Sequence, residues 1–258
     1  MRIKNVVKVM NFHSLLKVEK AKKKAEKYRD VGEEVTDIVR KIMYNKNLIL
    51  DKKVLTVDES KPVLNIYIAN DYGFCGDFNA SIRRQMKMDK DCYKIVVGSK
   101  ITLKDEKIIL KISKEDFYNR FVEIESAIYK ALDNMEYREI NLYYNHYNSS
   151  SSFSFMGLRL FPIEFDGDYY EGHDYVAETD PEKMIRSLVG FYICYQIKMC
   201  ESISLAAENL NRSQITKLAL DKIEEIEEEQ KNDEIREKNE KLIAKTVENF
   251  KKISREET

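Results

Sequence analysis

Neither glycine nor proline occurs between Phe191 and the last residue, Thr258. These two residues are the ones that most often end or kink a helix, so their absence predicts one uninterrupted helix on the order of 100 Å long. Apolar residues mark the face of this helix that we expect to be buried: Ile197, Cys200, Ile203, Ala207, Leu210, Leu218, Ile223 and Ile226.

The apolar face nearly disappears between Glu227 and Lys241, where Ile235 is the only such residue. A helix that is polar all round bridges solvent, lies in a wet cavity or frays. Disorder of this stretch is the alternative. Apolar residues then return at Leu242, Ile243, Val247, Phe250 and Ile253.

The other end of the chain has the same character, because Met1 to Lys61 contains no proline and one glycine, Gly32. Its apolar residues recur in steps of three and four, which is typical of a coiled-coil seam. The predicted seam residues are Val18, Ala21, Ala25, Tyr28, Val31, Val35, Ile38 and Ile42.

Charge is distributed unevenly between the two predicted helices. Residues 1–30 carry ten Lys or Arg against three Asp or Glu, whereas residues 221–241 carry ten acidic residues against five basic ones. If the helices run antiparallel, we expect Lys17 to Arg29 to lie near the acidic stretch, where opposite charges would help to set the register. The alternative is that each charged run is a solvated face.

Between the helices the periodicity changes to that of strands and shorter helices. Strands alternating with helices favour a mostly parallel α/β sheet. An antiparallel arrangement of the last two strands is the alternative. We expect strands at 63–69, 93–97, 107–112, 139–147 and 153–163, and helices at 79–88 and 115–135. The predicted fold is an antiparallel coiled coil of two long N- and C-terminal helices (1–61 and 181–258) with an inserted α/β domain (62–180).

Composition excludes several classes of protein. The 44 Lys and Arg nearly balance the 45 Asp and Glu, giving a net charge of −1, so nothing points to nucleic acid as a partner. No apolar run reaches the roughly 18 residues of a membrane-spanning helix, and the charged start Met1–Lys4 does not resemble a signal peptide. The four cysteines show no paired spacing, which favours a reduced, cytoplasmic setting.

The turn after the first predicted strand is the most distinctive motif. Residues 63–82 read VLNIYIANDYGFCGDFNASI. The turn resembles the S-D-R-G-L-C-G-G-F-N signature of the gamma subunit, the central rotor shaft, of F-type ATP synthases. The matching residues are Asp71, Gly73, Cys75, Gly76, Phe78 and Asn79.

Other segments carry the same resemblance over nearly the whole chain. They are similar to the family's R-I-K-x-V and M-K-M-V-x-x-x-K opening, its I-V-V-G-x-K strand, its strand pair ending L-P-I and its A-I-T-x-E segment. The matching residues are Arg2-Ile3-Lys4 with Val6, Leu16-Lys17-Val18 with Ala21 and Lys23, Ile95–Gly98 with Lys100, Tyr137–Ile140 through Phe161–Ile163, and Ala244–Glu248.

The resemblance implies a shaft that enters a ring of alternating alpha- and beta-like ATPase subunits, one copy per ring. Such a shaft catalyses nothing and needs no cofactor or metal, and it couples rotation to ATP synthesis or hydrolysis. Epsilon-like and membrane ring subunits are further expected partners, which would hold the chain in the cytoplasm at the inner face of the cell membrane without inserting it. The implied contact residues are Lys17, Lys241, Thr246 and Glu248, and the implied turn residues are Asp71, Gly73, Cys75, Gly76 and Asn79.

Some positions depart from the family pattern. Tyr72 stands where the family has arginine, Asp77 replaces the second glycine of C-G-G, and Lys241-Leu242 replaces Arg-Gln. The C-terminal tip is charged where the family's is apolar. These departures favour a specialised F-type-like ATPase without a proton ring that drives other mechanical work, such as gliding motility. A stand-alone coiled-coil adaptor is a second alternative.

Catalytic and metal-binding hypotheses find less support in the sequence. A nucleophile at Cys75 would need a Gly-x-Cys-x-Gly turn, but the fifth residue is Asp77, and it would need a base such as His146. We expect Cys75 to pack the turn against the sheet. The carboxylates between Asp166 and Glu171 could hold a cation weakly, although a solvated loop is the simpler interpretation.

Overall fold

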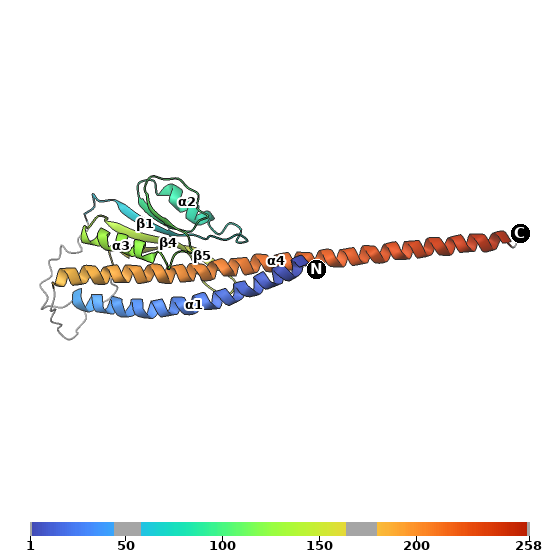
Figure 1. The fold of residues 1–258 in the computed structure, drawn as a ribbon, viewed down its shortest axis with the longest axis horizontal. Coiled ribbons are helices and arrows are strands. Elements are labelled where there is room, and N and C mark those ends of the chain that lie inside the picture. The colour runs from blue at the N-terminus through green and yellow to red at the C-terminus, as the bar shows by residue number, and fades with distance from the viewer. Residues whose placement is uncertain (1, 44–57, 164–179, 257–258) are drawn as a thin grey trace.

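The computed structural model describes residues 2–43, 58–163 and 180–256. Two long helices, α1 (Arg2–Met43) and α4 (Pro181–Glu256), pack side by side over the length of α1 (Figure 1). They run antiparallel, since Lys4 pairs with Glu227 near one end and Tyr28 packs on Tyr195 farther along. The predicted antiparallel coiled coil is therefore confirmed, and α4 begins at its predicted residue, Pro181.

The seam of α1 follows the predicted positions except at two places in its second half, where the buried residue is the next one along the chain. Val18, Ala21, Ala25, Val35 and Ile42 are buried as predicted, but Ile38 is 45% exposed and Val39 is fully buried instead. In the same way Gly32, and not Val31, is the buried seam residue. A β-carbon at Gly32 would lie 3.6 Å from the Gln196 side chain of α4, an ordinary van der Waals contact, so Gly32 faces α4 in the seam.

The inserted domain is a five-stranded sheet in the order β3-β2-β1-β4-β5. Strands β1 to β4 are parallel to their neighbours, and β5 is antiparallel to β4, which confirms the mostly parallel sheet. The strands are β1 (Val63–Ile68), β2 (Tyr93–Val97), β3 (Ile108–Ile112), β4 (Glu139–Tyr147) and β5 (Phe153–Phe161).

Helices cover both faces of this sheet. Helix α2 (Ala80–Met88) places Ile82 and Met86 on one face, against Tyr67 and Val96. Helix α3 (Phe121–Asp133) and the first part of α4 cover the other face. Because α4 belongs both to this core and to the coiled coil, the domain and the two long helices share one hydrophobic interior (Figure 1).

Beyond the N-terminus of α1, α4 continues without a partner helix (Figure 1). Two predictions about α4 fail. Leu218 and Ile226, expected on the buried face, are 68% and 43% exposed. The acidic stretch does not face Lys17 to Arg29 either; among the basic residues of α1 it is Lys4 that reaches Glu224 and Glu227, at 3.3 and 2.7 Å. The stretch 227–241 is continuous helix.

Candidate functional site

The signature turn lies at the carboxyl ends of the parallel strands, where open α/β sheets usually bind ligands. Here α4 covers that position. Asn211 of α4 donates a hydrogen bond to the Cys75 carbonyl at 2.6 Å, and the Arg212 guanidinium lies 3.4 Å from the Gly73 carbonyl. The crevice is thus filled by a helix of the same chain.

Asp71 ties the turn to the two neighbouring loops. One carboxylate oxygen accepts a hydrogen bond from the Ser99 amide at 2.5 Å, after β2, and the other accepts one from the Glu115 amide at 3.1 Å, after β3. A single side chain therefore connects the ends of three adjacent strands.

Only one of the two glycines in the turn adopts a backbone conformation that favours glycine. Gly76 adopts a left-handed conformation, φ +48°, which favours glycine. Gly73 does not, and a side chain placed there would meet no atom within 4 Å. Phe74 takes the other left-handed position of the turn, at φ +60°.

Asn79 precedes α2 at the N-cap position but makes no capping hydrogen bond. Its side chain instead pairs with Asn70: its amide donates to the Asn70 side chain at 2.7 Å, and its oxygen accepts from the Asn70 backbone at 3.2 Å. Both residues are buried, so this pair closes the turn from inside.

Cys75 is buried and its thiol faces α4, not a base. Its Sγ lies 3.4 Å from Arg212, and burial is the main cause that raises the pKa of the thiol. His146 hydrogen-bonds the Tyr144 hydroxyl at 3.0 Å. Among the described residues no hydrogen bond joins this thiol to an imidazole, and the burial of Cys75 agrees with a packing role.

A buried charged cluster lies beneath the turn and was not anticipated from the sequence. Lys114, in the loop after β3, lies 3.1 Å from Glu208, and Arg212 lies 2.6 Å from the other oxygen of the same carboxylate. The Glu208 side chain is wholly buried. One sequence signal could have revealed it: Glu208 and Arg212 stand four residues apart among alanines and leucines of a face expected to be apolar.

A second buried acid, Glu201, lies about two turns before Glu208 on α4. It accepts a hydrogen bond from the Tyr118 hydroxyl at 2.5 Å, and Lys24 of α1 stands over the Tyr118 ring at 3.2 Å. Burial raises the pKa of Glu201, and nearby Lys114 and Lys24 oppose that effect. Polar contacts thus join α1, α4 and the α/β domain at one level of the coiled coil.

The four implied contact residues lie on the surface or at the far end of α4. Lys17 is exposed on α1. Lys241 is exposed beside Glu237, and the Thr246 hydroxyl bonds the Leu242 carbonyl within the helix at 2.9 Å. Glu248 lies on α4, but its side chain is outside the described part. The structure does not bring Lys17 together with the other three.

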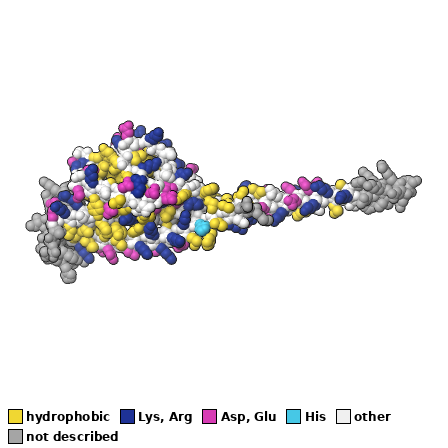
Figure 2. All heavy atoms as spheres, viewed as in Figure 1, with side chains coloured by type: hydrophobic (Ala, Val, Ile, Leu, Met, Phe, Trp, Pro, Cys, Tyr) yellow, Lys and Arg dark blue, Asp and Glu magenta, His cyan; other side chains and the backbone are white. Residues whose placement is uncertain are grey.

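Large apolar side chains are exposed around the free end of α1 and along the projecting part of α4 (Figure 2). Exposed apolar side chains in such number indicate a surface that contacts another protein. They are Ile3, Val6, Val9, Phe12, Leu15 and Leu16 on α1, and Leu218, Ile226, Ile235, Leu242, Ile243 and Val247 on α4.

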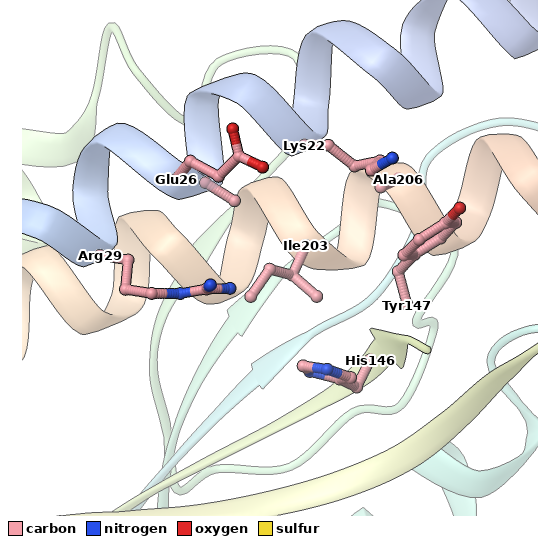
Figure 3. Close-up of a pocket in the computed structure, with 8 residues that line it drawn as sticks. Lys22, Glu26, Arg29, His146, Tyr147, Ile203 and Ala206 are labelled. Carbon is pink, nitrogen blue, oxygen red and sulfur yellow. The ribbon is translucent and has the colours of Figure 1, made fainter. Parts of the chain in front are cut away.

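A small cavity of about 110 Å³ lies between α1, β4 and α4 (Figure 3). Lys22, Arg29 and Glu26 line it together with His146, whose pKa burial lowers. Ala25, Ile203 and Ala206 form the apolar part of the cavity wall. Its residues join the coiled coil to the sheet.

No group of three or more metal-ligating side chains occurs in the described ranges. The Asp166–Glu171 carboxylates lie outside them. Within the same ranges, none of the helices combines the length and apolar character needed to cross a membrane.

Comparisons with known proteins agree with this architecture. The model of the family described as ATP synthase matches residues 1–235. The ATP synthase gamma chain of Rickettsia typhi is 24% identical over 164 residues, which are 58% of this chain and 57% of that relative. The gamma chain of Amoebophilus asiaticus is 23% identical over 240 residues, 86% of this chain and 82% of that relative.

Solved structures give the same result for the fold. The chain is similar to one in the cryo-EM structure of the central stalk and c-ring of Tetrahymena thermophila mitochondrial ATP synthase, with a TM-score of 0.60 and 19% identity. The similarity covers 83% of this chain and 99% of that one.

Proposed function

The chain belongs to the ATP synthase family, and on that premise we propose that it is a gamma-like central-stalk subunit, the rotor shaft of an F-type ATPase. Its helix pair would enter a ring of alternating alpha- and beta-like subunits, one copy per ring. Epsilon-like and membrane ring subunits would bind outside that ring. The complex would lie at the inner face of the cell membrane.

The observation that carries this proposal is the shape of α4. One unbroken helix is packed into the α/β domain at one end and projects beyond its partner helix at the other (Figure 1). A rod of this kind can transmit torque because the part of α4 that packs into the α/β domain is anchored there by a shared hydrophobic core and by the buried ion pairs of Glu208. The exposed apolar side chains near the free end of α1 supply a surface for the surrounding ring.

The shaft itself is proposed to be non-catalytic. Its role is to present a different face to each of three surrounding catalytic subunits, so that their nucleotide states differ and change in turn. This is coupling through differential contacts between two sites. Lys17, Lys241, Thr246 and Glu248 are the proposed contacts with those subunits.

The test is purification of the tagged full-length chain from its native cell, with subunit identification by mass spectrometry. We expect three alpha-like and three beta-like ATPase subunits for each copy of this chain. Ring subunits alongside them would identify an ATP synthase, and their absence together with unfamiliar partners would identify the specialised motor. Recovery of the chain alone or as a self-associated coiled coil would overturn the proposal in favour of the adaptor.

A further inference from the structure

The part of α4 that lies in the shared hydrophobic interior begins with a regular apolar repeat. Four residues of similar shape follow one another in steps of four, and each is 1% exposed or less: Ile185, Val189, Ile193 and Ile197. If α4 shifted along its axis by four residues, about one turn, three of the four positions would again hold a member of the repeat. Apolar burial along this repeat therefore distinguishes poorly between registers that differ by one turn.

A steric contact at the start of α4 does distinguish these registers. Tyr129 of α3 lies over Gly190, where a β-carbon would be only 2.5 Å from the aromatic ring. A shift of one turn in either direction would bring Arg186 or Cys194 to this place, and both residues carry a β-carbon. In a close-packed interior such an overlap forces the ring or the helix to move.

A polar contact distinguishes the registers farther along α4. Lys114, in the loop after β3, lies 3.1 Å from Glu208, and their side chains are 3% and 0% exposed. A shift of one turn would bring either Arg212 or Ser204 to the place of Glu208. Arg212 would bury a second positive charge beside Lys114, and Ser204 would leave Lys114 buried without an acid. Either shift is therefore penalised by a buried charge that lacks its partner.

We propose that these two contacts, Tyr129 on Gly190 and Lys114 on Glu208, form a register key that holds the α/β domain in one position along α4. Replacing a buried ion pair by apolar residues is often neutral or stabilising, so net stability does not account for such a pair, and setting a register is its best-attested use. The key would fix both the axial and the rotational position of the domain on the long helix. This inference goes beyond the shaft proposal and does not require it.

Distances between two spin labels, measured by double electron–electron resonance in the purified full chain, test the register key. Nitroxides are attached to cysteines introduced at two exposed positions, Lys87→Cys on α2 and Lys217→Cys on α4, with Cys92→Ser because the other cysteines are buried. Lys114→Met with Tyr129→Ala removes both points of the key from the domain side and leaves α4 unchanged. We expect one distance in the labelled natural chain. The variant should add a second distance, displaced by up to about 6 Å, the rise of four helical residues.

The matched control is Lys107→Met with Tyr93→Ala, which changes the same two residue types. Their contacts, with Asp91 at 3.2 Å and with the Tyr137 ring, lie within the α/β domain. The control should keep the single distance of the natural chain. That single distance in the Lys114→Met, Tyr129→Ala variant would overturn the proposal, and so would a second distance in the control or in the natural chain.

A second variant decides the case in which the first does not fold. It replaces the buried charges together, by Lys114→Leu, Glu208→Leu and Arg212→Met, and adds Tyr129→Ala. No charge of this group is left unpaired, so we expect it to fold. It should show the same second distance, and a single natural distance would overturn the proposal. Failure of both variants to fold would also overturn it, because the two contacts would then be needed for stability and not for choosing a register.

Discussion

Lys114 Nζ lies 3.1 Å from Glu208 Oε2 in the interior of the protein, and their side chains are 3% and 0% exposed. This contact joins the loop after β3 to the long helix α4, so it connects the α/β domain directly to the shaft. Arg212 bonds the other carboxylate oxygen from the next turn of the same helix. Glu208 therefore sits between two cations that would be left buried and unpaired without it.

Removing the shared acid should harm stability more than removing one of its cations. We expect Glu208→Ala to lower the free energy of unfolding by about 3–5 kcal/mol, since it strands two buried positive charges. Lys114→Met should cost less, because Glu208 keeps Arg212 and the methionine fills a similar volume. Urea unfolding of both variants measures the order, and a larger loss for Lys114→Met would contradict it.

The buried acid Glu201 should make stability depend on pH. Its folded pKa is raised above the ordinary 4.5 by burial, so between 4.5 and the folded pKa the native state holds a proton that the unfolded state has released. Stability should therefore fall as pH rises through this window, with a slope of up to about 1.4 kcal/mol per pH unit.

Glu201→Gln supplies the comparison, because glutamine can still accept the hydrogen bond from Tyr118 but does not titrate. We expect the variant to gain stability relative to the natural chain as pH increases from 4.5 upwards. Urea unfolding at a series of pH values measures this difference. Parallel stability profiles for the two proteins would show that Glu201 does not titrate in this way.

Two glycines near the turn should respond differently to alanine. Gly98 has φ +124°, and a side chain there would lie 2.9 Å from Ala69, so Gly98→Ala should cost about 1–3 kcal/mol. Gly73→Ala meets open space without a left-handed backbone, and we expect a change within about 0.5 kcal/mol. Thermal or urea unfolding distinguishes them, and equal losses would argue that the turn needs Gly73 for another reason.

The projecting part of α4 should be dispensable for folding but needed for assembly. Every hydrogen bond and ion pair made by a described side chain from 228 to 247 is to another residue of α4. A chain ending at Lys231 keeps the Lys4 contacts with Glu224 and Glu227. We expect its unfolding midpoint to be unchanged while ATPase subunits no longer co-purify. A clear loss of stability would mean that the projecting helix packs against the body of the protein.

Much of the fold was predictable because it depends on local sequence. The absence of Gly and Pro predicted the continuous helix, and the strand and helix periods predicted the order of elements and the parallel sheet. The long helix α3 was predicted from residue 115 but begins at Phe121, since the preceding residues form turns that place Phe117 in the core. The turn signature indicated the family, and the family match confirms it.

The turn chemistry was less accessible from sequence. Asp71 and Asn79 were expected to support the turn, but their partners, Ser99, Glu115 and Asn70, come from other loops. The seam position Gly32 was missed because a pattern of apolar residues does not count glycine as a packing residue. The exposure of Leu218 and Ile226 was missed because the sequence of α4 does not say which of its faces lies against α1; both residues lie alongside α1 but face away from it.

The sequence by itself determined the two long helices, the α/β insertion and the resemblance to a rotor shaft, because periodicity and helix breakers act over neighbouring residues. Only the tertiary structure decided which residues anchor the domain to the shaft. Lys114 and Glu208 are 94 residues apart in the chain, and a salt bridge between them exists only because the sheet places the end of β3 against the middle of α4. The burial of both side chains also depends on that placement. Because they are buried, removing either residue would leave the charge of the other unpaired in the interior.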